Sequence, residues 1–165
     1  MAKTLKIHNK SSKPDNVVEK ENIIISQCEV LEKDMPSFLI DFFIFLKNAV
    51  SITTRLAYLQ DIVFFLNYLC LESPLVHCEI PKDIKSVDFV QLRARDINRY
   101  LGDYCVRYYS TVGETTYIME NHNRSLSRKR SSLSVLFKFL FRDEIMRENI
   151  AHGFNPIKLP KPQPD

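Results

Sequence analysis

The sequence predicts one mostly helical domain. Hydrophobic residues make up 45% of the 165 residues, which is enough for a core, and only three residues are glycine. An all-β domain with many tight turns uses more glycine than this. Apolar residues also recur at helical spacing in several stretches that are separated by prolines. The expected fold class is therefore all-α, a compact bundle of four to five helices.

Four main helices are predicted from caps, periodicity and proline positions. They cover residues 36–48, 52–71, 94–109 and 125–142. The second is the clearest, because Ser51 can cap its start and Pro74 ends it. One side of this helix is apolar, and the other, which includes Asp61, is expected to face solvent. A short fifth helix is expected around 82–90, within an otherwise irregular stretch.

The chain divides into three parts by composition. Residues 1–33 are expected to form a partly disordered arm, although 22–31 fit either a strand or the start of a helix. Residues 34–153 form the helical domain. Residues 154–165 are expected to be a proline-rich linker, because four prolines in the last ten residues cannot continue a helix.

Positive charge gathers near the two ends of the chain. Residues 1–13 carry a net charge of +4 and residues 121–165 carry +5, whereas residues 14–92 carry −6. A basic C-terminal third is typical of a protein with a polyanionic partner. A solvated basic surface explains the same charges equally well.

The sequence points to a cytoplasmic protein without a cofactor, metal or small-molecule ligand. No stretch of 18 residues lacks a charge, and the first residues contain no apolar core of a signal peptide. The cysteines show no CxxC spacing, so four reduced thiols are expected rather than a zinc site or a redox pair. These are Cys28, Cys70, Cys78 and Cys105. The four histidines share no ligand spacing either, and no catalytic residue is identified.

The stretch RSLSRKRSS (124–132), at the start of the fourth helix, is the strongest candidate for a binding site. Arginine and lysine supply charge, small hydroxyl residues allow close approach to a phosphate backbone, and a helix start adds free amides. Lys129 falls toward the apolar side and would have to extend outward. An ordinary basic surface helix is the competing interpretation. The candidate DNA contacts are Arg124, Ser125, Ser127, Arg128, Lys129 and Ser131.

The start of the second helix offers a similar but weaker set. Hydroxyl groups and one arginine can bind phosphates or bases, and these residues are Thr53, Thr54, Arg55 and Tyr58. Taken alone, a capped helix with ordinary surface residues explains them better. Further along, Phe64 and Tyr68 fall on the outward side and need cover, either from the loop after Pro74 or from another protein.

Three segments, taken in order, resemble the N-terminal core-binding domain of tyrosine recombinases of the Xer and phage-integrase type. TRLAYLQDIVFFLNYL (54–69) is similar to the family's T-x-x-x-Y-x-x-D run, and LRARDINRYL (92–101) to its L-x-x-x-D-I-x-x-Y-L. SRKRSSLSVLFKFLFRDEIMRENI (127–150), followed by NPIKLPKP (155–162), resembles the family's basic, serine-rich helix and the Asn-Pro and Leu-Pro-Lys that follow it.

This resemblance implies a SAM-like helical domain that forms one half of a clamp around double-stranded DNA. It implies that the second and fourth helices face the DNA, and that other helices touch neighbouring protomers of a recombinase tetramer. The family's chemistry, in which a tyrosine attacks a phosphodiester, belongs to a second domain that is expected to follow the linker. The fragment itself is therefore expected to be inactive, although its parent would be an enzyme of DNA integration or recombination.

The sequence also departs from the family pattern. Arg130 stands where leucine is common, Ser134 where arginine is common, and the arm at 1–33 has no clear counterpart. Two other functions remain open, a stand-alone helical DNA-binding regulator and a helical protein-interaction module whose partner covers Phe64 and Tyr68.

Overall fold

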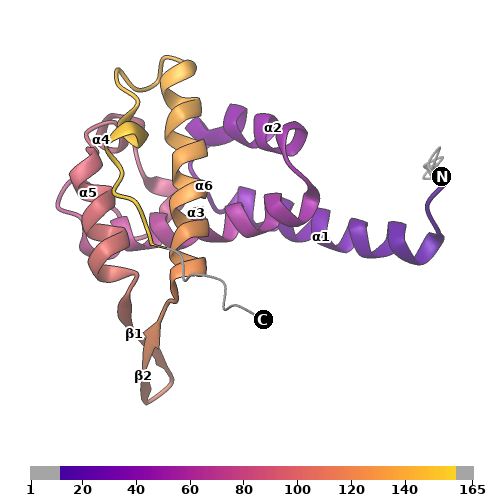
Figure 1. The fold of residues 1–165 in the computed structure, drawn as a ribbon, viewed down its shortest axis with the longest axis horizontal. Coiled ribbons are helices and arrows are strands. Elements are labelled where there is room, and N and C mark those ends of the chain that lie inside the picture. The colour runs from indigo at the N-terminus through magenta and orange to yellow at the C-terminus, as the bar shows by residue number, and fades with distance from the viewer. Residues whose placement is uncertain (1–11, 159–165) are drawn as a thin grey trace.

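A computed structural model describes residues 12–158 of the chain. This part holds six α-helices and one two-stranded antiparallel sheet (Figure 1). The helices are α1 (Asp15–Lys33), α2 (Ile40–Ala49), α3 (Ile52–Glu72), α4 (Ser86–Phe89), α5 (Ala94–Arg99) and α6 (Asn123–Arg142). The strands are β1 (Arg107–Val112) and β2 (Thr115–Glu120). Single turns η1 (Ser37–Leu39), η2 (Pro81–Asp83), η3 (Tyr100–Tyr104) and η4 (Ile150–Gly153) complete the order.

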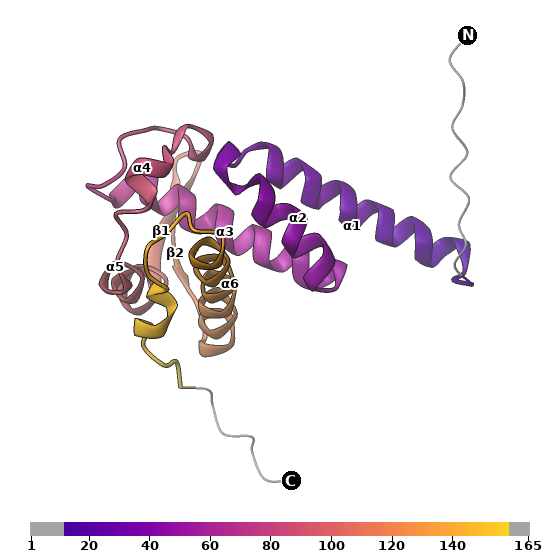
Figure 2. The same cartoon turned by 90° about the horizontal axis from the view of Figure 1, so that it is seen from above.

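Helix α3 is the centre of the fold. Its start is capped by Ser51, whose hydroxyl accepts a hydrogen bond from the Thr54 amide, and it ends just before Pro74, as predicted. α1, α2 and α6 all pack against it, and α6 crosses it in Figures 1 and 2. The core between these helices is rich in aromatic and leucine side chains, and its fully buried members include Phe42, Phe65, Phe89, Phe137, Leu46, Leu59 and Leu66.

Most of the predicted arm is helical, so the prediction for residues 1–33 is wrong for 15–33. Cys28 of α1 is fully buried, and α1 packs along α3. The N-terminal end of α1 extends beyond the rest of the fold (Figure 2). Ile23 and Val30 are apolar but exposed, which weakens the amphipathic pattern from which a helix is recognised. The domain thus begins before residue 34, and residues 1–11 lie outside the described part.

The predicted helix 94–109 is only half correct. α5 ends at Arg99, the π-helical turn η3 follows, and the chain then forms β1 and β2. Both strands are rich in aromatic and β-branched residues, which favour strands. Gly113, with φ 63°, is the first of two turn residues between them, as in a type II′ turn. The fold is therefore mostly helical, which is roughly consistent with the all-α prediction, and it has one small two-stranded sheet that was not predicted.

Phe64 and Tyr68 are covered from within the chain, by η3 and β1 rather than by the loop after Pro74. The Phe64 ring lies 5.1 Å from that of Tyr108, and the Tyr68 ring lies 4.8 Å from Tyr100 and 4.6 Å from Tyr104 (centroid distances). Tyr100, Tyr104 and Tyr108 therefore serve packing. The hairpin is anchored at its base by this aromatic layer.

The first residues of the predicted linker are attached to the domain. Phe154 is buried against Phe137, and the Asn98 side chain donates to the carbonyl of Gly153 and accepts from the amide of Asn155. Residues 159–165 lie outside the described part. Within residues 12–158, every helix is too short or too polar to cross a membrane.

Candidate nucleic-acid interface

The sequence-predicted contacts at the start of α3 have three different environments. Thr53 is exposed, and its hydroxyl lies 3.2 Å from that of Ser51. Thr54 is half-buried and accepts a hydrogen bond from Ser51. Tyr58 is also half-buried and packs against the core. Only the hydroxyl cluster around Thr53 is therefore directly presented to solvent.

Arg55 is not a surface residue. Its side chain is 4% exposed, and its Nη2 donates to Glu32 Oε1 at 2.8 Å. The pair joins α3 to α1, which the sequence prediction had treated as an arm. Because burial of an unpaired guanidinium is costly, Glu32 is the group that permits Arg55 to lie inside. In this arrangement the Arg55 guanidinium is buried and paired, whereas the sequence had placed it among the candidate DNA contacts.

The second predicted region, α6, meets α3 at a buried carboxylate. Arg128 Nε donates to Asp61 Oδ2 and Arg128 Nη2 donates to Asp61 Oδ1, each at 2.9 Å. Lys129 Nζ donates to Asp61 Oδ1 at 3.1 Å and lies 4.6 Å from the Phe64 ring centroid. Asp61 is 2% exposed, whereas the sequence predicted a solvent-facing position. A carboxylate at such a depth requires these partners.

The two cations that bind Asp61, Arg128 and Lys129, differ in how far their side chains are exposed to solvent. Lys129 is 10% exposed, so it points inward, and the prediction that it would extend outward is wrong. Arg128 remains 48% exposed, and hydrogen bonding to Asp61 raises its pKa. Within residues 12–158, no group bonds to Arg128 Nη1. The cluster has two cations and one carboxylate, so it keeps one positive charge, and Arg128 presents it to solvent.

The remaining residues at the start of α6 are accessible. Arg124 and Ser131 are exposed, and Ser125 and Ser127 are half-buried. Arg124 forms no ion pair within the described residues. The N-cap residue, His122, gives no side-chain cap, so the first amides of α6 have no side-chain acceptor from it. An exposed arginine, serine hydroxyls and free amides are suited to binding phosphate oxygens.

Two further arginines of α6 have structural partners. Arg130 donates to the backbone carbonyls of Asn155 and Phe154, which fixes the segment after η4 against the helix. Arg142 lies over the rings of Phe45 and Phe139, at 4.9 and 5.3 Å. Lys138 is exposed and has no ion pair within residues 12–158. The basic character of α6 is therefore partly structural, and its free cations are Arg124, Lys138 and the outer edge of Arg128.

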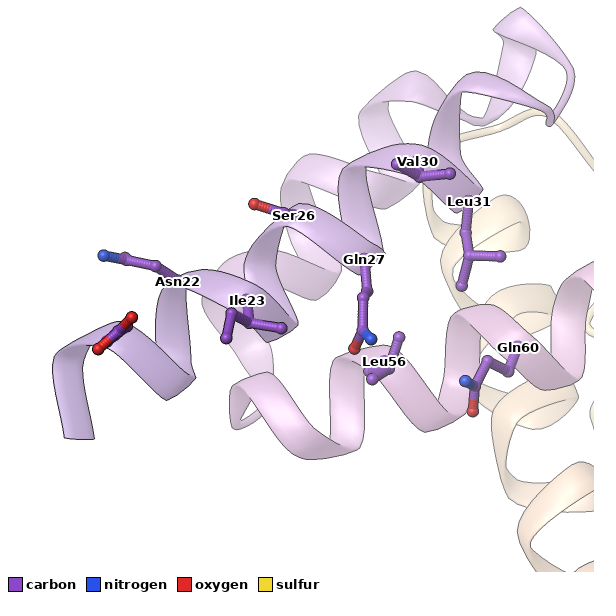
Figure 3. Close-up of a pocket in the computed structure, with 9 residues that line it drawn as sticks. Asn22, Ile23, Ser26, Gln27, Val30, Leu31, Leu56 and Gln60 are labelled. Carbon is purple, nitrogen blue, oxygen red and sulfur yellow. The ribbon is translucent and has the colours of Figure 1, made fainter. Parts of the chain in front are cut away.

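A surface hollow of about 620 Å³ lies between α1 and α3, and none of these cations lines it (Figure 3). Its walls are mostly apolar or amide side chains, and Glu19 is its one charged residue. The residues labelled there are Asn22, Ile23, Ser26, Gln27, Val30, Leu31, Leu56 and Gln60. This hollow holds no catalytic arrangement. Within the described residues, no three histidine, cysteine or acidic side chains are grouped as metal ligands.

No protein-family model matches the chain, and neither a curated protein nor a solved structure shows detectable similarity to it.

Proposed function

We propose that the chain binds double-stranded DNA as the non-catalytic, N-terminal half of a tyrosine-recombinase clamp. The observation that carries this proposal is that the three segments resembling the recombinase family pack together. Segment 54–69 supplies Asp61, and segment 127–150 supplies Arg128 and Lys129. Segment 92–101 supplies Tyr100, whose ring lies 4.9 Å from that of Phe65. The resemblance therefore rests on residues that contact one another in space.

The proposed DNA surface is smaller than the set of residues chosen from sequence. It consists of the exposed residues Thr53, Arg124, Arg128 and Ser131, with Ser127 beside them. Arg124 lies about 6 Å along α6 from Arg128, and Thr53 lies about 12 Å along α3 from Asp61, at 1.5 Å per residue. A duplex laid across the crossing of the two helices meets the Thr53 hydroxyl of α3 and the hydroxyl and guanidinium groups of α6. Arg55 and Lys129 support this surface from inside.

Asp61 gives Arg128 a fixed direction. A free arginine loses several rotatable bonds when it binds a phosphate, whereas a guanidinium already held by two hydrogen bonds loses fewer. Asp61 thus prepares the outer edge of Arg128 for a phosphate oxygen, without supplying sequence specificity.

Phosphodiester chemistry is assigned to a second domain that follows the linker. The tyrosines of η3 and its neighbours are poor nucleophiles, because burial raises the pKa of Tyr68, Tyr100 and Tyr104 and keeps their phenols protonated. Each ring also packs within an aromatic layer, in which Tyr68 stacks on Phe65 and Tyr100 stacks on Tyr104. The described chain therefore supplies binding and orientation rather than cleavage.

A second candidate function, protein interaction, is favoured by the hairpin. Tyr109 and Ile118 are paired directly across the strands, and they are 72% and 52% exposed. Val112 and Tyr117, on the opposite face of the hairpin, are 68% and 52% exposed. Projecting apolar side chains of this kind are typical of a partner contact. From the sequence, this function was based on a partner that would cover Phe64 and Tyr68. That basis no longer applies, because the chain itself covers both side chains.

The proposal is tested by titrating the purified chain into a fluorescently labelled duplex at low and rising salt. Saturable binding that weakens linearly on a log–log plot of affinity against salt is expected, because phosphate contacts release counterions. A chain that does not bind the duplex even at low salt would leave protein interaction as the better supported function.

A further inference from the structure

Two cysteines that are eight positions apart in the sequence lie side by side at the end of α3. The sulfur atoms of Cys70 and Cys78 are 3.6 Å apart, and both residues are free thiols that are partly exposed to solvent. A disulfide has an S–S length near 2.05 Å, so the sulfurs need to approach by about 1.5 Å. A movement of this size lies within reach of side-chain rotation and a small shift of the loop.

The proximity of the two sulfurs is built by the packing of the chain around them. α3 ends at Glu72. The next residue, Ser73, caps the helix: its amide donates to the carbonyl of Leu69, and its hydroxyl accepts from the amide of Leu75. Val76 is then buried, with 4% exposure, so the chain turns back over the last turn of α3. This return places Cys78 beside Cys70, although no CxxC spacing marks the pair in the sequence.

We propose that Cys70 and Cys78 form an oxidation site that closes into a reversible intramolecular disulfide, with a low-molecular-weight disulfide such as oxidised glutathione as co-reactant. The thiolate of one cysteine attacks a sulfur of the glutathione disulfide, which releases one glutathione thiolate and leaves a mixed disulfide on the protein. The second cysteine then attacks the protein sulfur of that mixed disulfide and releases the second glutathione. Two thiols of the protein are oxidised, one disulfide is reduced to two thiols, and the two protons pass to solvent or to the released thiolates.

The surroundings of the pair indicate which sulfur reacts first. Burial raises the pKa of Cys70 to about 12, and its hydrogen bond to Cys78 acts in the same direction. Cys70 is therefore protonated at neutral pH, with its sulfur within hydrogen-bonding distance of the sulfur of Cys78. Cys78 attacks the oxidant, and Cys70 is the resolving thiol. Cys28 and Cys105 are fully buried in the core, so neither competes for the oxidant in the folded chain.

The test exposes the full-length folded chain to oxidised glutathione, followed by alkylation under denaturing conditions, intact-mass measurement and peptide mapping. We expect a monomer that has lost two alkylatable thiols, with Cys70 and Cys78 peptides linked, and full reversal by dithiothreitol. Cys28 and Cys105 serve as internal controls, because both should remain alkylatable after denaturation. A product that carries only stable glutathione adducts, or only intermolecular disulfides, would overturn the proposal.

A second measurement does not depend on mass. The bond closes a short loop, so the oxidised chain should melt roughly 5 °C above the reduced chain. Cys78→Ser, which keeps the size of the side chain, should show the same Tm in both conditions. An equal Tm for oxidised and reduced wild type, despite complete bond formation, would contradict the expected anchoring of the loop. Neither readout involves DNA, so the outcome is separate from that of the proposed function.

Discussion

Asp61 and Arg128, 67 positions apart in the sequence, are joined by two parallel hydrogen bonds of 2.9 Å that fasten α6 to α3. Lys129 adds a third bond to the same carboxylate. The contact therefore combines two tasks, since it holds the two central helices together and sets the direction of a half-exposed arginine.

The first prediction concerns the stability that Asp61 provides. Asp61→Asn should lower the free energy of unfolding by about 3 kcal/mol, because it leaves buried Lys129 without a counter-charge. Arg128→Ala should cost less, about 1 kcal/mol, since Lys129 still pairs with Asp61 and Arg128 is half-exposed. Urea unfolding followed by circular dichroism measures both. Glu114→Gln, which removes an exposed carboxylate at the hairpin turn, is the control and should change stability by less than about 0.5 kcal/mol. Equal stability of Asp61→Asn and wild type would show that the cluster contributes nothing.

The second prediction separates a structural role for Arg55 from a role in DNA binding. Arg55→Met should change the free energy of unfolding of the chain. It should leave the salt dependence of duplex binding unchanged, because the Arg55 guanidinium is buried against Glu32. Glu32→Gln should lower the free energy of unfolding by about 3 kcal/mol, since Arg55 then remains buried without its partner. If Arg55→Met instead reduces the salt slope of binding by about one unit, Arg55 contacts phosphate and the α1–α3 pair opens on DNA.

The third prediction concerns the hairpin turn. Gly113 has φ 63°, so Gly113→Ala should destabilise the hairpin by about 1 kcal/mol through backbone strain. Gly102→Ala is a matched control, because its added methyl group meets nothing within 4 Å and its φ is not in the left-handed region. Hydrogen exchange of the β1 and β2 amides measures the local effect. A hairpin equally protected in both variants would argue against the strained turn.

The fourth prediction is a loss of stability in alkali. Burial raises the pKa of Cys105 from its ordinary value near 9 to about 11. The folded state thus keeps this thiol neutral at a pH where the unfolded chain ionises it, so the stabilisation is complete below pH 9 and is lost as pH rises to 11. The expected loss over this interval is about 2 kcal/mol. Urea unfolding at pH 8 and pH 10.5 measures it, and Cys105→Ala should show a smaller decline. A decline of the same size in Cys105→Ala would assign it to other groups, such as the buried Tyr100.

The long helices were predictable because their signals are local. The predicted ranges 52–71 and 125–142 correspond to Ile52–Glu72 and Asn123–Arg142, and in α3 the Ser51 cap and Pro74 mark the two ends. The hairpin was missed because the tyrosines at 100, 104 and 108 continue a helical spacing across η3 into β1. Its available signal was the run of aromatic and β-branched residues on both sides of Gly113.

The site was harder to predict because its contacts are non-local. The stretch around Arg128 was identified from its composition, but no nearby sequence feature indicates that Asp61 is the partner of Arg128. An acid within the apolar run of α3 was the one available signal, and it was assigned to a solvent-facing side that α6 in fact covers. The burial of Arg55 depends in the same way on α1, which was not recognised as a helix.

The most direct test of DNA binding by the start of α6 compares two single-charge variants of that helix. Arg124→Ala and Lys138→Ala each remove one exposed cation without an ion pair in the described structure, and the two sites are about 21 Å apart along α6. Binding of each variant and wild type to one labelled duplex is measured across a range of salt concentrations. We expect Arg124→Ala to weaken binding and to lower the slope of log affinity against log salt by about one unit, while Lys138→Ala matches wild type. DNA binding by the start of α6 is contradicted if Arg124→Ala binds like wild type at every salt concentration while Lys138→Ala loses affinity.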